Sequence, residues 1–289
     1  MKSQRTLLIL MILSMCVWGL SWSSAKILSS YGSATSITYI RFVLVPLTLF
    51  PILLFSKTKI GISWKGLPQV LIAGTLMTIY TVLFFSGLQR GLAGAGGVLV
   101  ANSIPIFTYI ISLVLTKKWP SKNAVWGLAL GAVGGVILIN VWDNYTNVFA
   151  AGNSYFLVAA FVWAILAKIT SGSSRFGSPV SFNFWLHLIA VIVLTFLADF
   201  QEISRILIDG DLKFWSNIFY FGVINSSVAT TLYFYSTTKL GAEKASSFIF
   251  IVPSAAVLFS WIFMNEPVTF RILIGGILGI AAVFIINRK

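Results

Sequence analysis

The residues best suited to bind a solute are polar, aromatic or cationic side chains, or prolines, that fall within long apolar stretches of the chain. A polar group surrounded by hydrocarbon needs a partner or water, so it tends to face a bundle interior or a wet cavity. Each such residue also has a simpler interpretation, because serine can bond to its own helix and tryptophan can merely pack. The twelve candidates are Trp18, Trp22, Lys26, Arg41, Tyr80, Asn102, Ser103, Pro105, Trp163, His187, Asn225 and Pro253.

The cationic candidates are accompanied by aromatic residues. Trp18, Trp22 and Lys26 recur every four residues, which places them on one face of a helix. Indole faces can hold a cation or a flat apolar group; alternatively, Trp22 and Lys26 form an interfacial belt, with the ammonium reaching lipid headgroups. Arg41 stays protonated in proteins and therefore needs a partner or water. Lys168 lies near the end of an apolar run, where we expect it to reach the headgroups.

Two prolines and a single histidine are the other candidates. A proline inside a helix frees a backbone carbonyl, so Pro105 and Pro253, with Asn102 and Ser103, predict either solute contacts or kinks that serve packing and gating. His187 is interpreted either as a hydrogen-bonded structural group or as a proton-coupling site. Because no Asp or Glu falls in the centre of an apolar run, the usual carboxylate proton relay is not expected.

The elements that position these residues are predicted to be membrane helices. The 289 residues are 58% hydrophobic and only 9% charged, although the net charge is +13. A nucleic-acid-binding protein would carry such a charge on a polar surface, which a mean hydropathy of +0.94 excludes. Each apolar run is near the length of about 17–25 residues that crosses a bilayer. The sequence therefore predicts an all-α integral membrane protein with ten transmembrane helices, at residues 6–28, 36–55, 67–88, 94–115, 123–141, 152–170, 179–198, 214–236, 244–264 and 269–287.

The basic residues predict the orientation. If both termini lie on one side, that side receives thirteen Lys and Arg residues, the other side receives four, and three fall inside spans. The positive-inside rule then places both termini in the cytoplasm. We expect a multi-pass protein of the bacterial inner membrane whose first apolar run is an uncleaved helix rather than a signal peptide. The segment 199–213 is the longest predicted loop.

An internal repeat predicts the architecture. At an offset of 148, Pro105 aligns with Pro253, Gly127 with Gly275, and Gly131 with Gly279; residues 17–20 align with 162–165 at an offset of 145. The sequence thus predicts two five-helix repeats, residues 1–145 and 146–289. Since five is odd, the second repeat enters the membrane from the opposite side, and such inverted repeats are typical of secondary transporters. Duplication without transport is the alternative.

These landmarks, in this order, resemble the EamA-type, ten-helix branch of the drug/metabolite transporter superfamily. One departure is Lys118, which stands where the family usually has an acid matching Glu266. The resemblance implies a carrier of small molecules, often an exporter of amino acids or related metabolites, with a central cavity lined by both halves. The residues that carry it are Trp18-Gly19, Arg41-Phe42, Pro105, Trp163-Ala164, Leu240-Gly241-Ala242, Pro253, Glu266-Pro267, Gly275 and Gly279.

We therefore predict an exporter of a small neutral, zwitterionic or anionic solute, because a cationic solute would need a buried carboxylate. Alternatives within the same resemblance are a flippase of a lipid-linked small molecule and a drug efflux carrier; a channel or a structural membrane protein is the non-carrier alternative. No enzyme, phosphate-loop or paired-histidine metal motif is present in the sequence. We expect no cofactor, no metal and no nucleic acid, with the solute and the lipid bilayer as partners of a functional monomer.

Overall fold

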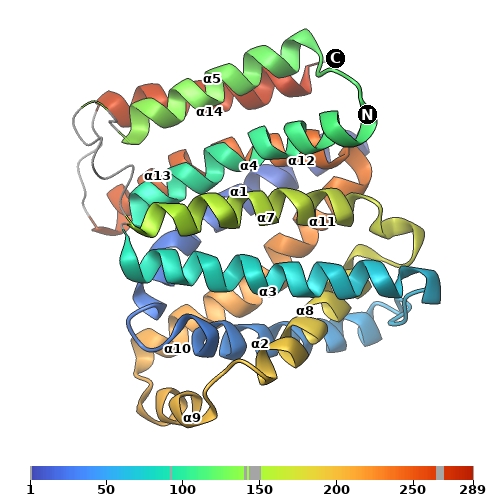
Figure 1. The fold of residues 1–289 in the computed structure, drawn as a ribbon, viewed down its shortest axis with the longest axis vertical. Coiled ribbons are helices and arrows are strands. Elements are labelled where there is room, and N and C mark those ends of the chain that lie inside the picture. Colours follow the sequence, from blue (N-terminus) through green and yellow to red (C-terminus); the bar gives the residue numbers. More distant parts are fainter. Residues whose placement is uncertain (1, 92, 140–141, 143–150, 265–269, 289) are drawn as a thin grey trace.

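The computed structural model describes residues 2–91, 93–139, 142, 151–264 and 270–288, and the regular elements within these ranges are all helical. The helices pack side by side in a bundle (Figure 1). In chain order they are α1 (Lys2–Leu28), α2 (Ala34–Phe55), η1 (Trp64–Gly66), α3 (Leu67–Arg90), α4 (Ala93–Thr116), α5 (Lys122–Ile139), α7 (Ala151–Ser171), η2 (Ser173–Arg175), α8 (Pro179–Thr195), α9 (Phe200–Asp209), α10 (Leu212–Phe219), η3 (Tyr220–Ala229), α11 (Thr230–Leu240), α12 (Ala242–Ser247), η4 (Phe248–Ile251), α13 (Val252–Met264) and α14 (Phe270–Asn287).

Capping residues set where several helices begin. Ser33 precedes α2 and accepts a hydrogen bond from the Ser36 N–H, and Ser178 precedes α8, whose first residue is a proline. Asp199 accepts from two backbone N–H groups at the start of α9, and Asp211 does the same with one at the start of α10. Each cap satisfies backbone donors that would otherwise lack partners at a helix start.

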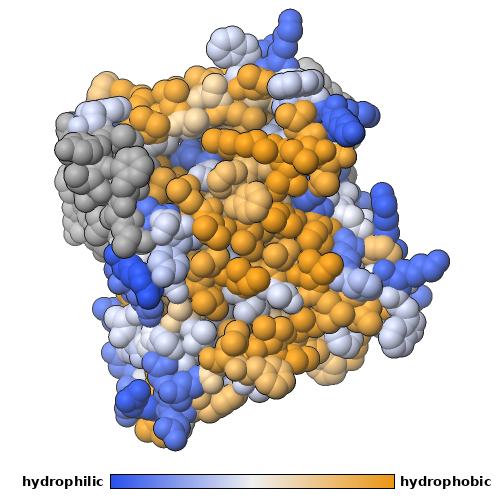
Figure 2. All heavy atoms as spheres, in the orientation of Figure 1, coloured by the Kyte–Doolittle hydropathy of each residue, from blue (hydrophilic) through white to orange (hydrophobic). Residues whose placement is uncertain are grey.

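Five helices in the described ranges are long and apolar enough to cross a membrane: 5–28, 34–55, 64–90, 96–116 and 152–175. Large apolar side chains are exposed on their outer faces, including Leu47 on α2 and Val114 on α4. Figure 2 shows an apolar band across the middle of one face, with hydrophilic side chains on both sides of it. An apolar band of this extent is suited to lipid rather than to water.

The helix contacts define two edges and the middle of the bundle. At one edge, α5 lies along α14 (Figure 1), and an added Cβ on Gly134 would be 3.0 Å from the Gly275 carbonyl oxygen. Towards the opposite edge α2 packs on α8, while α7 contacts both α3 and α4. The N- and C-terminal ends of the chain lie at the same end of the bundle, which we call the terminal end.

Two predicted segments differ from the structure. The expected loop at 199–213 contains the amphipathic helix α9, which bends by 112° from α8 and buries Ile203 and Ile206. The expected helix at 214–236 is a longer chain of α10, η3 and α11, in which η3 is π-helical. Hydrophobicity did not reveal α9 because only one side of that short helix is apolar. Glu266 and Pro267, two of the residues that carry the resemblance, lie outside the described residues.

Candidate functional site

A small cavity lies in the centre of the bundle. Its volume of about 50 Å³ corresponds to room for roughly four water molecules. Elements from both predicted repeats line it, namely α1 to α4 from the first, and α7, η3, α11, η4 and α13 from the second. Half of the predicted solute-binding residues are in its wall: Trp18, Trp22, Arg41, Tyr80, Trp163 and Asn225.

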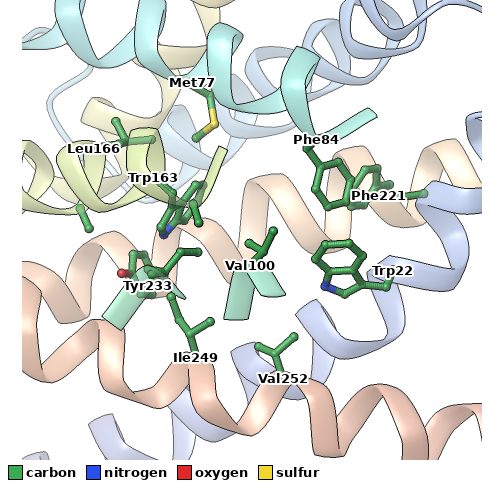
Figure 3. Packing of buried hydrophobic residues seen from close by; sticks show 14 of the residues in the cluster. Trp22, Met77, Phe84, Val100, Trp163, Leu166, Phe221, Tyr233, Ile249 and Val252 are labelled. Carbon is green, nitrogen blue, oxygen red and sulfur yellow. The ribbon is translucent and has the colours of Figure 1, made fainter. Parts of the chain in front are cut away.

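Aromatic rings form much of this wall. The Trp18 ring is 5.1 Å from that of Trp163 in an edge-to-face arrangement, and Trp163 is 4.6 Å from Tyr80. On the other side of the cavity the Trp22 ring is 4.7 Å from that of Phe84. Figure 3 shows the Trp163 ring on one side of Val100 and the Trp22 and Phe84 rings on the other. The cavity therefore offers broad apolar faces with a few polar atoms between them.

Arg41 places a positive charge in this wall. Its side chain is only 5% exposed, its Nε donates to Ser226 Oγ at 2.8 Å, and its Cζ lies 3.8 Å from the centre of the Phe221 ring. Within the described ranges Arg41 forms no ion pair, and its two Nη groups make no hydrogen bond. A buried guanidinium without a carboxylate is costly unless an anion or water reaches it.

The π-helical segment η3 holds Arg41 in place. Ser226 Oγ donates to the Phe221 carbonyl oxygen at 2.7 Å, and Thr230 Oγ1 donates to that of Asn225 at 3.0 Å, both across five residues. Such i→i+5 turns are rare and occur often at functional sites. Asn225 Oδ1 is buried and has no hydrogen-bond partner among the residues described.

A second unpaired polar atom belongs to α1. Trp18 Nε1 is buried and, within the part of the chain that the structure describes, has no acceptor. Most buried polar atoms in native proteins are paired, and exceptions are often explained by function or by a water or ion. In those same ranges no three His, Cys, Asp or Glu side chains are grouped as metal ligands.

Two predicted residues use their polar atoms elsewhere. Lys26 Nζ donates to the Leu88 carbonyl oxygen at 2.6 Å and to that of Gly91 at 3.2 Å, so it satisfies the C-terminal carbonyls of α3. Asn102 Nδ2 donates to the carbonyl oxygen of Val98, within its own helix. The structure places neither side chain in the cavity wall.

His187 and the remaining candidates also lie outside the wall. The His187 side chain is fully buried, with Nδ1 3.0 Å from the Asn183 carbonyl oxygen and its ring edge-on to Phe42. Ser103 and Pro105 are on α4 away from the cavity. Pro253, predicted to kink a helix, is instead the second residue of α13, directly after η4, where a missing N–H costs little.

A polar cluster near the terminal end corrects our expectation for Lys168. Its ammonium does not point outwards to headgroups but lies 2.8 Å from Glu243 Oε1 and 2.6 Å from Ser112 Oγ. Ser112 also donates to Glu243, and the two charged side chains are only about one quarter exposed. We call Ser112, Lys168 and Glu243 the terminal cluster. It joins α4 to α7 and α12.

The sequence missed the apolar half of the wall. Apolar wall residues have the same composition as ordinary core residues, and nothing in a single sequence distinguishes a side chain that lines a cavity from one that packs in the core. Ser226, which holds Arg41, belongs to a polar run at 225–227 that did stand out at midspan. The wall residues that were not predicted are Ser21, Met77, Phe84, Val100, Ala101, Ile104, Phe221, Thr230, Ile249 and Val252.

The fold and the cavity together define a multi-pass membrane protein with a central, partly polar chamber. The model of the EamA-like transporter family matches residues 5–141 and again residues 150–288. The chain therefore belongs to the EamA-like transporter family and is a transporter of that family.

Several relatives and one solved structure agree with this assignment. An uncharacterized transporter of Archaeoglobus fulgidus is 25% identical over 97% of this chain and 98% of its own length. The uncharacterized transporter YoaV of Bacillus subtilis is 25% identical over 93% of this chain and 92% of its own length. A probable terminal-alkyne amino-acid exporter of Streptantibioticus cattleyicolor is 22% identical over 78% of this chain and 74% of its own length. A crystal structure with a TM-score of 0.75 and 15% identity, covering 98% and 96%, shares the fold.

Proposed function

We propose that the chain is a secondary transporter that exports a small organic solute by alternating access around the central cavity. The solute is an amino acid or a similar neutral, zwitterionic or anionic metabolite. The observation that carries the proposal is the cavity itself, in which Arg41 has no counter-ion among the described residues and helices of both repeats contribute to the wall. The S. cattleyicolor relative supports an amino-acid-like solute and export.

The proposed architecture is ten spans in two inverted repeats, residues 1–145 and 146–289. Two separate family matches support the duplication. Helix contacts support a two-fold relation between the repeats, because two of them recur with the repeats exchanged: α3 packs on α7 as η3 packs on α1, and α4 packs on α7 as α13 packs on α1. The odd number of spans per repeat supports the inversion. In this proposal α10–η3–α11 and α12–η4–α13 each form one span, and both termini are cytoplasmic in a bacterial inner membrane.

The transport cycle needs movement between the repeats. A cavity of about 50 Å³ is smaller than an amino acid, so loading requires the aromatic walls to separate. The terminal cluster ties the two repeats together on the cytoplasmic side, which closes that side in this conformation. The wall is complete within one chain, which supports function as a monomer. No observation favours the lipid-linked flippase or the drug efflux alternative.

Counterflow in proteoliposomes tests the proposal. Vesicles loaded with unlabelled L-leucine should take up external labelled leucine faster than empty vesicles, and the uptake should saturate. Flux that does not saturate and is not accelerated by internal solute would indicate a channel. Rapid transport of tetraphenylphosphonium, a permanent cation, without inhibition by leucine would overturn the proposed solute class.

A further inference from the structure

We propose that Arg41 binds the carboxylate of the transported solute and that Asn225 accepts a hydrogen bond from a donor on the adjacent carbon. The substrate class is then a 2-amino or 2-hydroxy acid with an apolar side chain. This inference rests on the proposed function and assigns individual roles within its site.

The Arg41 side chain is already oriented for such a ligand. Phe221 supports the face of the guanidinium at 3.8 Å, and Ser226 accepts from Nε at 2.8 Å. These contacts leave Nη1 and Nη2 without partners among the described residues. Two parallel N–H donors match the two oxygens of a carboxylate and can bind it bidentately. The ligand thereby supplies the counter-charge that the wall lacks.

Asn225 lies next to the residue that holds Arg41. Its neighbour Ser226 bonds to Arg41, and its own Oδ1 is buried without a partner. An unpaired carbonyl oxygen calls for a donor, which a hydroxyl or an ammonium beside the carboxylate supplies. No Asp or Glu is among the described residues of the wall, so nothing in that part of it requires the donor to be charged.

The rest of the wall determines the ligand's side chain. Val100, Ile249, Val252 and the flexible side chain of Met77 also line the cavity. Figure 3 shows Val100 between the aromatic groups, with Ile249 and Val252 below them. A branched aliphatic side chain can pack among these groups without leaving a polar atom unpaired. A second charged group on the solute would have no partner there.

Calorimetric binding to the purified full-length protein in detergent tests these roles with four related ligands. They are L-leucine, 2-hydroxy-4-methylpentanoate, 4-methylpentanoate, which lacks the adjacent donor, and leucinamide, which lacks the carboxylate. We expect the first two to bind best and leucinamide to bind at least about tenfold more weakly, since it loses charge-assisted hydrogen bonds.

Two substitutions separate the two roles. Arg41→Gln should weaken the binding of all three carboxylate ligands at least about tenfold, and Arg41→Lys should restore only part of the lost affinity. Asn225→Ala should weaken the binding of leucine and of the hydroxy acid about fivefold but leave the affinity for 4-methylpentanoate unchanged. Arg90→Gln is the matched control, because Arg90 lies over Tyr155 at an exposed position away from the cavity.

The outcomes are distinct from those of the transport proposal. Equal binding of leucine and leucinamide, or an Arg41→Gln protein that elutes as a folded monomer and binds carboxylates normally, would overturn the role of Arg41. An Asn225→Ala loss that is the same for 4-methylpentanoate would overturn the role of Asn225. Saturable counterflow of another solute that is unaffected by Arg41→Gln would support the proposed carrier function but overturn the role of Arg41.

Discussion

Two cations inside the bundle have opposite surroundings. Lys168 in the terminal cluster contacts a carboxylate and a hydroxyl, so its charge is neutralised by the protein itself. Arg41, in the central cavity, contacts a serine hydroxyl and an aromatic ring but no carboxylate in the described ranges. Although Arg41 is the more buried of the two, it is the one without a counter-ion.

This difference separates structure from recognition. An ion pair that is complete within the protein can join helices, but it has nothing left to offer a solute. A buried charge without a partner in the protein is unfavourable until a ligand of opposite charge pairs with it. Such a site therefore favours the binding of an anion. The same physical rule therefore indicates a connecting role for the terminal cluster and a binding role for Arg41.

The largest effect is expected from giving Arg41 a counter-ion of its own. Ser226→Asp places a carboxylate where the Arg41 Nε now bonds, so the guanidinium becomes internally paired, as Lys168 already is. Carboxylate binding should fall at least about tenfold, because the new carboxylate neutralises the guanidinium and repels the carboxylate of a ligand at Nη1 and Nη2. Titration calorimetry with leucine measures this change.

Ser226→Asn is the matched control, since it has the size of Asp without the charge. It should bind leucine several-fold more tightly than Ser226→Asp does. Equal binding by the two variants would mean that steric crowding, not charge, caused the loss, and the contrast between Arg41 and Lys168 would disappear.

The next effect tests whether the terminal cluster is structural. Glu243→Gln leaves Lys168 unpaired, and we expect a lower unfolding temperature with leucine affinity changed by less than about threefold. Adding Lys168→Met should recover part of the loss, with a coupling energy of about 1 kcal/mol for this partly buried pair. Additive losses in the double variant, or a collapse of leucine affinity in Glu243→Gln alone, would contradict this division of roles.

A third cation refines the comparison at the opposite end of the bundle. Lys26 is partnered by the carbonyls of Leu88 and Gly91, which carry the partial negative charge of the C-terminus of α3. Lys26→Met should lower the unfolding free energy by about 0.3–1 kcal/mol and leave leucine affinity unchanged. Loss of leucine binding in this variant would return Lys26 to the solute site.

The smallest effect concerns a carboxylate at the surface, Glu202 on α9. Its burial opposes ionisation, but hydrogen bonds from the side chain and backbone N–H of Ser33 and from Ser36 outweigh this and hold the pKa of Glu202 below its ordinary value. A lowered pKa adds stability above the unfolded-state pKa of about 4.3, and this stability is lost as the pH falls through the folded-state pKa.

Unfolding temperatures measured from pH 7 downwards check this sign. Wild type should exceed Glu202→Gln at neutral pH, and the difference should shrink below about pH 4. Asp209→Asn, on the same helix, is the control for removing one negative charge. A difference that grows on acidification would show that the hydrogen bonds do not favour the ionised carboxylate.

The sequence predicted the helical class and most helix positions, because a run of apolar residues is itself the signal for a membrane helix. It missed α9 because a short interfacial helix is apolar on one side only. It did not reveal that residues 220–229 are π-helical either, because such segments are rare and this one has no hydrophobic pattern that sets it apart from an α-helix.

The cavity wall was predictable where polarity or aromaticity contrasted with the surroundings. Trp18, Arg41 and Asn225 stood out for this reason, and all three line the cavity. The sequence could not show that Lys168 points inwards, because its partner Glu243 is 75 residues away and pairing depends on the tertiary fold. Val100 and Ile249 carried no signal, since wall and core residues have the same composition.

The fixed charge of Arg41 has an electrical consequence for the proposed cycle. Over a full cycle the charge of Arg41 stays with the protein, so exporting a 2-hydroxy acid moves one negative charge outwards, while an amino acid crosses with no net charge. Across an inside-negative membrane, 100 mV favours the first process by about 2.3 kcal/mol and leaves the second unaffected. Two solutes held by the same contacts would then be distinguished by voltage alone.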